Sequence, residues 1–326
     1  MMLRSIIHYL YKRLPDFSPT RPHPNELLFT VQHLLPPKLL TFCPYFLQGR
    51  PLPTCTRGFN MSTPSSSPRD SPWRITTSQN PALDVLEQAR KLAQTMELPY
   101  SVRGGSSITR LGRRFPGVGW LIAGPRRSLT CITPNGQRMR WHLGLAKSRI
   151  AAANRGQPDY LLQSLEPKPG ERYFDGTLGM AHDALLVASR GAEVVAMEID
   201  PIVHALTSHG LQALSEHAGD LPNAATRVTT VAGDHTHYLR GCITDAFDGV
   251  FFSPMFVDPR FHAVDLEGLR EIAHCTWLHP EALSEARRVS RKVILKLERG
   301  CHPALPTPSR WIGSSRRRLT YALYER

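Results

Sequence analysis

The second half of the chain alternates short apolar segments with helical patterns. Five strand candidates follow one another, with helical patterns between the first four and before the last: ERYFDGT, AEVVAMEID, RVTTVAGD, FDGVFFSP and RKVILKLE. Parallel strands need helical crossovers, so this alternation predicts a parallel, doubly wound α/β sheet of Rossmann-like type with helices on both faces. The final segment, RRRLTYALYER, has the alternation of an edge strand and is expected to pair antiparallel.

The first 73 residues differ in composition from the rest of the chain. They contain twelve of the 28 prolines and end in STPSSSPRDSP, which is typical of low-complexity segments. We therefore expect a disordered tail over residues 1–73. Two alternatives stay open, namely a true start at Met61 and a targeting peptide formed by the basic amphipathic segment LRSIIHYLYKRL.

Residues 74–141 are expected to form a small α+β module rich in arginine, ahead of the α/β domain at 142–326. Asn80 and Pro81 supply an N-cap and a first-turn proline, and a helical pattern follows until Pro99. The positions predicted to share the buried face of this helix are Leu83, Leu86, Ala89, Ala93 and Met96. The segments GWLIAG and SLTCITPNGQRMRWH predict short strands, with a turn at residues 134–136.

The charge balance indicates a polyanionic partner. With 40 lysines and arginines against 27 acidic residues, the chain carries a formal net charge of +13, which favours nucleic acid ahead of an anionic membrane. A basic tail or a generally basic proteome is the alternative. No apolar run reaches the roughly 18 residues that a membrane span needs, so no membrane partner is expected. The arginine-rich module is then a candidate face for RNA or DNA.

The six cysteines are scattered, and no pair has the C-x-x-C spacing. This argues against both a zinc site and a disulfide framework and is typical of a reducing compartment, so we expect a cytoplasmic protein without a metal. His235 and His237 have an H-x-H spacing, but no third ligand is apparent. Solvated loop histidines are the favoured interpretation.

Three consecutive strand candidates end in an acidic residue: Asp175, Glu198 and Asp234. In a parallel sheet the carboxyl ends lie at one edge, where ligands bind near the switch in strand order. Glu198 follows Asp175 by 23 residues, a spacing suited to an acid that accepts hydrogen bonds from ribose hydroxyls. The loop with Gly176 and Gly179 lacks the G-x-G-x-x-G pattern of dinucleotide sites. The pattern therefore favours an adenosine ligand without a pyrophosphate, such as S-adenosylmethionine.

The segment FDGTLGMAHDALLVASRGAEVVAMEIDPIVHALTSHGL resembles the cofactor segment of class I methyltransferases of the RsmJ type, the small-subunit ribosomal RNA guanine-N2 methyltransferases. It is also similar to a related group of uncharacterised bacterial methyltransferases. The resemblance extends upstream through WHLGLAKSRIAAANRGQPDYLL and downstream through FFSPMF and ARRVSRKVILKLERG, and it covers roughly residues 80–305. It implies S-adenosylmethionine as the cofactor and RNA as the partner.

The resemblance also implies roles for individual residues. The positions that would hold the cofactor are Asp175, Gly176, Gly179, His182, Asp183, Glu198, Ile199, Gly233 and Asp234. Among them, Glu198 would hold the ribose and Asp234 would accept from the adenine amine. His182 and Asp183 stand where the family has Arg-Asp facing the cofactor. Three basic residues in the helical segment ahead of the first strand candidate would contact RNA phosphates, with a solvated helix face as an equal alternative: Lys147, Arg149 and Arg155.

The fourth strand candidate ends in S-P-M-F, from Ser253 to Phe256, where the RsmJ type has D-P-M-F. Amino-methyltransferases commonly carry D/N/S-P-P-Y/F/W at this place. The side-chain oxygen and the proline carbonyl accept the two N–H bonds of an exocyclic amine, and the aromatic residue stacks on a flipped base. Ser253, Pro254 and Phe256 are therefore the candidate catalytic residues. A serine accepts more weakly than the family carboxylate, so aspartate at position 253 is expected to retain or raise turnover.

The combined interpretation is an S-adenosylmethionine-dependent methyltransferase that acts on an exocyclic amine of a nucleobase, with guanine N2 in ribosomal RNA as the preferred target. Three alternatives remain. The first is methylation of an amine in DNA or in a small molecule. The second is a methyltransferase-like RNA-binding protein without turnover. The third is a nicotinamide oxidoreductase, which the missing glycine pattern disfavours.

Overall fold

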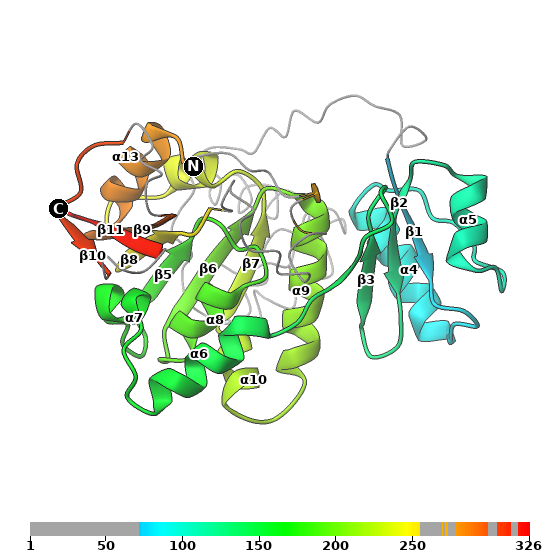
Figure 1. The fold of residues 1–326 in the computed structure, drawn as a ribbon, viewed down its shortest axis with the longest axis horizontal. Coiled ribbons are helices and arrows are strands. Elements are labelled where there is room, and N and C mark those ends of the chain that lie inside the picture. The colour runs from blue at the N-terminus through cyan, green and yellow to red at the C-terminus, as the bar shows by residue number, and fades with distance from the viewer. Residues whose placement is uncertain (1–71, 255–268, 270, 273–277, 299–304, 314–318) are drawn as a thin grey trace, which may run out of the picture. The chain divides into compact units, whose positions relative to one another are not determined.

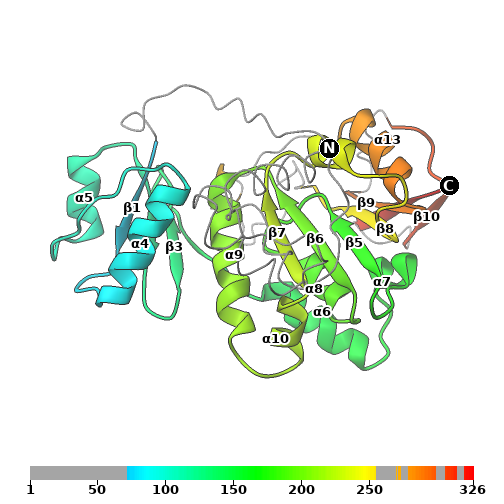
Figure 2. The same ribbon diagram turned by 180° about the vertical axis from the view of Figure 1, so that it is seen from behind.

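The structure is a computed structural model that describes residues 72–254, 269, 271–272, 278–298, 305–313 and 319–326, shown in Figure 1 and from behind in Figure 2. The expected disordered tail, with its alternative start at Met61, lies outside the described residues except for residues 72 and 73. Within the described ranges, no helix combines the length and the apolar composition needed to cross a membrane.

Seven strands form the larger sheet, in the order β10-β11-β9-β8-β5-β6-β7. Five of them are mutually parallel: β5 (Arg172–Asp175), β6 (Glu193–Glu198), β7 (Val228–Ala232), β8 (Gly249–Phe252) and β9 (Lys292–Glu298). All five strand predictions are confirmed. The order also defines the switch point, because the chain runs outward from β5 to β6 and β7 and then places β8 on the other side of β5.

The C-terminal strand pairs as predicted but does not lie at the edge. β11 (Leu319–Glu325) is antiparallel to β9, with Tyr321 opposite Lys296. Its other side is covered by β10 (Arg310–Ile312), which is antiparallel to it and forms the edge. The edge prediction was wrong because a strand of three residues is too short to show a periodic pattern.

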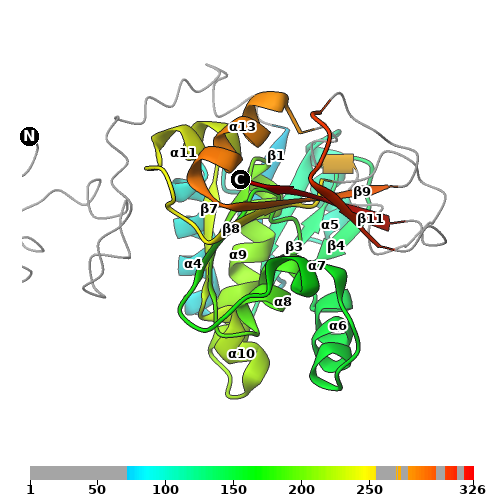
Figure 3. The ribbon, with the colours of Figure 1, turned by 90° about the vertical axis from the view of Figure 1, so that its left-hand side faces the viewer.

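Helices cover both faces of this sheet, as the side view in Figure 3 shows. On one face lie α6 (Gly144–Asn154), α7 (Tyr160–Leu165) and α8 (His182–Ala188), which pack on side chains such as Tyr173 and Phe251. On the other lie α11 (His235–Gly241) and α13 (Pro280–Val289), which pack on Phe174 and Phe252. Successive strand residues point to opposite faces, so each parallel strand contributes to two cores. The doubly wound architecture is thereby confirmed.

The N-terminal module contains a separate sheet in the order β1-β2-β3-β4. β1 (Trp73–Thr77) is parallel to β2 (Gly119–Ala123), and β3 (Leu129–Ile132) and β4 (Arg138–Arg140) continue antiparallel. The predicted strands correspond to β2, β3 and β4, and the predicted turn joins the last two, where Gly136 has a φ of 85°. β1 and α5 (Ile108–Arg114) are additional elements that the sequence pattern did not predict.

Helix α4 (Leu83–Thr95) begins later than predicted, and its buried face matches the prediction only in part, because Ala89 and Ala93 are buried whereas Leu83 is not. Its N-cap is Ala82, and Asn80 lies upstream with a φ of 47°. Leu83 is 78% exposed. The buried residues are Val85, Ala89, Leu92 and Ala93. A shift of two residues rotates a helix by about 200°, which places Leu83 on the side opposite Val85.

Several contacts join the module to the larger domain. Helix α9 (Pro201–Ser215), after which α10 (Asp220–Ala225) follows, shares an apolar cluster with the module's sheet and α4. The indole nitrogen of Trp141 donates to the carbonyl of Met180 (3.0 Å). A Cβ at Gly210 of α9 would lie 2.1 Å from the Trp141 ring, so a glycine is needed there.

Candidate active site

The carboxyl ends of β5, β6, β7 and β8 bring the predicted residues to one edge of the sheet. The segments that end or leave these strands carry Asp175, Glu198, Asp234 and Ser253. At the switch point the β5–α8 loop lies beside the residue after β8, because the backbone N–H of Ser253 donates to Thr177 Oγ1 (2.6 Å). Ligands of doubly wound sheets bind at this position.

The β5–α8 loop is anchored by Asp175, which is 1% exposed. Its Oδ1 accepts from the backbone N–H of Thr177 (2.9 Å). Gly176 is required in this loop because an added Cβ would lie 2.1 Å from the ring of Phe252, the last residue of β8. Burial raises the pKa of Asp175 to about 8, so the carboxyl group is mostly protonated at neutral pH.

Replacing Asp175 by asparagine is expected to raise the free energy of unfolding at neutral pH by about 1–4 kcal/mol. The pKa of Asp175 is higher in the folded state than in the unfolded state, so the wild-type fold loses stability as the pH rises from about 4 to about 8. Asparagine is neutral throughout and still accepts from Thr177. Urea unfolding across this pH range measures the effect, with the exposed Asp220→Asn as the control. Wild-type and Asp175→Asn stabilities that change in parallel with pH would contradict the expectation.

Glu198, the last residue of β6, links two of the strand ends. Its Oε2 accepts from the N–H of Gly179 (3.0 Å) and its Oε1 from the N–H of Asp200 (3.0 Å). Each carboxylate oxygen has a second lone pair, which leaves acceptor capacity for a ligand. A Cβ at Gly179 would meet only the carbonyl oxygen of Thr177, at 3.9 Å, so the loop beside Glu198 is open. Burial raises the pKa of Glu198.

The residues that follow Glu198 and those that follow β7 complete a group of side chains that fits an adenosine. Ile199 follows Glu198 and is 46% exposed, which offers an apolar surface to a planar ring. Gly233 has a φ of 139°, and its N–H donates to the carbonyl of Glu198 (2.8 Å). Asp234 is exposed and caps α11 by accepting from the N–H of His237 (2.7 Å). Two carboxylates suit hydroxyl and amine donors, so these residues fit S-adenosylmethionine.

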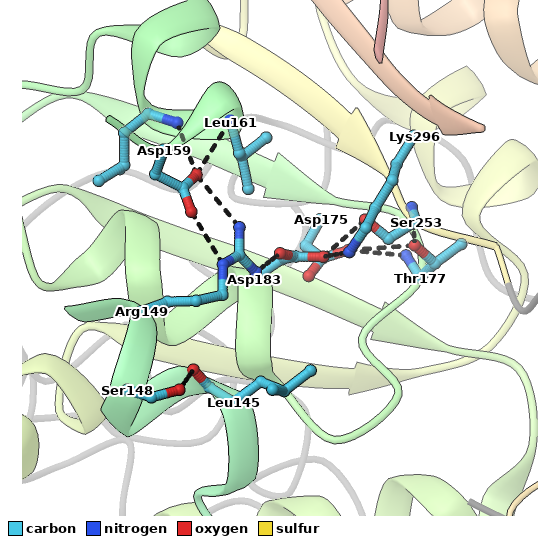
Figure 4. A network of polar contacts seen from close by, with 11 residues as sticks. Leu145, Ser148, Arg149, Asp159, Leu161, Asp175, Thr177, Asp183, Ser253 and Lys296 are labelled. Carbon is cyan, nitrogen blue, oxygen red and sulfur yellow. Dashed lines mark hydrogen bonds and ion pairs between the residues drawn. The ribbon is translucent and has the colours of Figure 1, made fainter. Parts of the chain in front are cut away.

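Asp183, in the first turn of α8, is the centre of a buried ionic network, shown in Figure 4. Its carboxylate accepts from Ser253 Oγ (2.7 Å), from Lys296 Nζ of β9 (3.1 Å) and from a guanidinium nitrogen of Arg149. Arg149 also donates to both carboxylate oxygens of Asp159 (2.9 and 3.2 Å). Burial opposes ionisation of Asp183, but the charges of Lys296 and Arg149 outweigh it and hold its pKa well below the usual range.

The ionised state of Asp183 decides the direction of its bond with Ser253. A carboxylate has no proton to give, so the Ser253 hydroxyl donates its hydrogen to Asp183 and keeps its lone pairs. The backbone of Ser253 is held by Thr177. Ser253 therefore presents an oxygen that can only accept. Pro254 follows and is half-buried, whereas Phe256 lies outside the described residues, so its stacking role stays a prediction.

The structure gives His182 and Asp183 partners within the protein, and their roles toward the cofactor stay a prediction. The His182 Nε2 lies 3.2 Å from the carbonyl oxygen of His142, and burial lowers the pKa of His182. Asp183 is directed at Ser253 and at two cations. His182 thus connects α8 to the segment before α6, and Asp183 connects α8 to the end of β8.

The three basic residues expected to contact RNA phosphates also differ from one another. Lys147 and Arg155 are exposed, on α6 and at its C-cap. Arg149 is half-buried, and its guanidinium is bound by Asp159 and Asp183. For Arg149 the expectation of a phosphate contact does not agree with the structure, because two carboxylates within the fold already neutralise its charge.

Three residues of the site were not among the predicted ones: Asp159, Thr177 and Lys296. A signal for Lys296 exists, because it stands between Leu295 and Leu297 in the otherwise apolar interior of its strand, and lysine is rarely buried without a partner. Thr177 had no such signal, since its contact with Ser253 joins residues 76 positions apart.

The H-x-H histidines do not form a metal site with described neighbours. The ring of His235 packs edge-on against Phe252, with centroids 5.3 Å apart. Throughout the described residues, no three His, Cys, Asp or Glu side chains are grouped so that they could hold a metal ion.

A pocket of about 530 Å³ borders the ionic network at Arg149 and Lys296. Tyr160 and Tyr321 contribute to its wall, with ring centroids 6.2 Å apart. Both cations are paired with carboxylates. The pocket therefore suits an uncharged planar group better than a phosphate.

Comparison with known proteins gives one family and several relatives. Residues 141–270 match the family model described as "Putative SAM-dependent methyltransferase". The chain is 27% identical over 226 residues to the uncharacterized protein YpiP of Bacillus subtilis, a match that covers 68% of this chain and 87% of that protein. It is 28% identical over 225 residues to ribosomal RNA small subunit methyltransferase J of Thioalkalivibrio sulfidiphilus, with coverages of 65% and 83%.

Other matches are shorter or structural. The match to ribosomal RNA small subunit methyltransferase J of Rhodopseudomonas palustris strain HaA2 is 38% identical over 76 residues and spans 23% of this chain and 35% of that protein. The crystal structure of a SAM-dependent methyltransferase from Neisseria gonorrhoeae superposes with a TM-score of 0.54 at 18% identity, covering 77% of this chain and 95% of that one. This likeness shows a shared fold.

Proposed function

We propose that this chain, a class I S-adenosylmethionine-dependent methyltransferase, methylates an exocyclic amine of a nucleobase, namely guanine N2 in ribosomal RNA. The observation that carries the proposal is the hydrogen bond from Ser253 Oγ to the ionised Asp183, which makes the hydroxyl oxygen an acceptor at the end of β8. The names of the relatives that are ribosomal RNA small subunit methyltransferases support ribosomal RNA as the substrate class.

The residues at the strand ends would hold the cofactor, which supplies an electrophilic methyl group on a sulfonium. Glu198 would accept from the ribose hydroxyls and Asp234 from the adenine amine. Ile199 would pack on the adenine ring. The open loop at Gly176 and Gly179 would lie along the methionine part, where backbone N–H groups suit its carboxylate.

Ser253 and Pro254 would make the exocyclic amine a better nucleophile. An exocyclic amine is a poor nucleophile because its lone pair is delocalised into the ring. If Ser253 Oγ accepts one N–H bond and the Pro254 carbonyl accepts the other, a localised lone pair is favoured and points at the methyl group. The amine nitrogen would take the methyl group that the cofactor supplies, the sulfur would leave with the electron pair of the S–C bond, and the methylated amine would release one proton to water. Neither residue has to act as a base.

Replacing Glu198 by alanine is expected to weaken S-adenosylmethionine binding by about 1–3 kcal/mol, because the ribose hydroxyls lose a buried acceptor. Isothermal titration of the full chain measures this, with NAD as a control ligand. Glu193→Ala is the matched variant, since Glu193 is exposed at the other end of the same strand. Equal affinities for the two variants would remove the ribose role of Glu198.

A methylation assay tests the proposed target directly. The full chain is incubated with unmodified small-subunit ribosomal RNA and S-adenosylmethionine, and the RNA is digested to nucleosides for mass spectrometry. The expected product is N2-methylguanosine. Methyl groups on duplex DNA with none on RNA would contradict the proposal, as would a methylated nucleoside without an exocyclic amine.

A further inference from the structure

The basic excess of residues 74–326 is confined to the N-terminal module. Residues 74–141 contain eleven arginines and lysines against three acids, a net charge of +8. Residues 142–326 contain 21 residues of each sign and are formally neutral. Inside the active-site network, Arg149 and Lys296 are paired with carboxylates. Within residues 74–326, long-range attraction for a polyanion therefore originates in the module.

The sheet of the module has two chemically different faces. Ile75, Leu121, Cys131 and Met139 are register partners on the inner face, where they share an apolar cluster with α4 and α9. Successive residues of a strand point to opposite faces, so the residues next to these point outward. Two rows cross the outer face: Arg74, Trp120, Ile132 and Arg138 in one, and Thr76, Ile122, Thr130 and Arg140 in the other.

Helix α5 adds further cations to this outer side. Phe115, directly after α5, packs edge-on against Trp120 of the outer face, with ring centroids 5.9 Å apart. The guanidinium of Arg74 lies 4.2 Å from the Phe115 ring centroid. The exposed arginines that α5 and β4 contribute, here called the arginine face, are Arg110, Arg113, Arg114, Arg138 and Arg140.

Among the described residues, no acidic side chain forms an ion pair with a member of the arginine face. The side chains of Arg113 and Arg138 are exposed and form no hydrogen bond or ion pair with another described residue. Arg140 donates to the neutral Thr130 hydroxyl (2.8 Å), which directs its side chain along the outer face. By contrast, Arg127 in the β2–β3 turn is paired with Glu216 of α9 (2.5 Å).

We propose that the arginine face is the surface on which the protein binds the sugar–phosphate backbone of its RNA substrate, apart from the active site. The nature of the polyanion rests on the proposed function, whereas the choice of surface rests on the charge distribution. Guanidinium groups bind phosphates in bidentate geometry. Trp120, the aromatic residue of the outer rows, is 2% exposed and is not available for stacking, so this face binds backbone and not bases.

The double variant Arg113→Gln/Arg138→Gln in the full chain tests the proposal. Binding of a fluorescently labelled single-stranded RNA is followed by anisotropy over a series of salt concentrations. The expected result is weaker binding and a salt slope smaller by about 1.4, since each phosphate contact in a single strand contributes about 0.7. The control is Lys168→Gln/Arg291→Gln, which removes two exposed cations from the neutral domain and should leave the slope unchanged.

Further measurements distinguish this proposal from a folding defect, from a membrane-binding surface and from the proposed methylation target. Calorimetric affinity for S-adenosylmethionine should be the same in both double variants, which excludes a folding defect. Equal losses of RNA affinity in both, or no loss in the first, would overturn the proposal. The proposal would also be overturned if the first double variant lost binding to phosphatidylserine vesicles but kept its RNA affinity, because the arginine face would then be a membrane-binding surface. If ribosomal RNA is not methylated but the first variant still loses RNA affinity, the surface stands and the proposed target does not.

Discussion

Asp183→Asn is expected to lower the free energy of unfolding by about 3–5 kcal/mol, the range measured when one partner of a buried ion pair is removed. The carboxylate is buried and balances Lys296 and Arg149. Asparagine keeps the shape and one acceptor but leaves the network with an uncompensated positive charge. Arg149 retains Asp159, so Lys296 is the cation that loses its partner.

Chemical unfolding of the full chain measures this effect, and two variants make it specific. Asp245→Asn is the matched control, because Asp245 pairs with Arg326 at an exposed position and should contribute less than about 1 kcal/mol. Adding Lys296→Met to Asp183→Asn removes the unpaired charge and should restore part of the stability. If Asp183→Asn and Asp245→Asn lower the free energy of unfolding by the same amount, the ionic network does not stabilise the site.

Ser253→Ala is expected to reduce kcat by about 100- to 1000-fold, the range found when one preorganised hydrogen-bonding group is removed from an active site. The methyl side chain cannot accept from the amine, whereas the backbone contact with Thr177 and the cofactor residues are untouched. The affinity for S-adenosylmethionine should therefore stay within a few-fold of wild type. Single-turnover methylation with saturating RNA isolates the chemical step.

Ser148→Ala is the control for this prediction, because that hydroxyl is exposed and bonds only locally to the carbonyl of Leu145. A loss confined to KM for RNA in Ser253→Ala, with kcat unchanged, would show that Ser253 positions substrate without preparing the amine. Equal kcat values for the two serine variants would remove Ser253 from the mechanism.

The structure changes the expectation for Ser253→Asp. From the motif alone, aspartate at this position should retain or raise turnover. The Ser253 oxygen lies 2.7 Å from the carboxylate of Asp183, so a second carboxylate there would meet like charge. We now expect Ser253→Asp alone to lose turnover, and Ser253→Asp/Asp183→Asn to recover it, since the double variant keeps one negative charge beside Lys296. A double variant no better than the single one would contradict this.

The alternation of strand and helix was enough to predict the sheet, because parallel strands require crossovers and buried strands are apolar on both faces. The acids at the strand ends and the resemblance predicted an S-adenosylmethionine-dependent methyltransferase, which the family model over residues 141–270 and the methyltransferase relatives bear out. The position of Glu198 and Ser253 at strand ends followed as well, since carboxyl ends of parallel strands share one edge. Short elements such as β1, α5 and β10 were not predicted, because segments of three to seven residues show too little periodicity.

The order of elements along the chain is therefore enough to predict which residues reach the edge of the sheet. Their contacts at that edge depend on the folded arrangement of the chain. The bonds of Asp183 to Arg149, Ser253 and Lys296 join residues 34, 70 and 113 positions apart. No local pattern encodes such pairs, because each partner satisfies its own helix or strand independently. Burial then makes the pairing obligatory, since a lone charge in that place would cost more than the fold can supply.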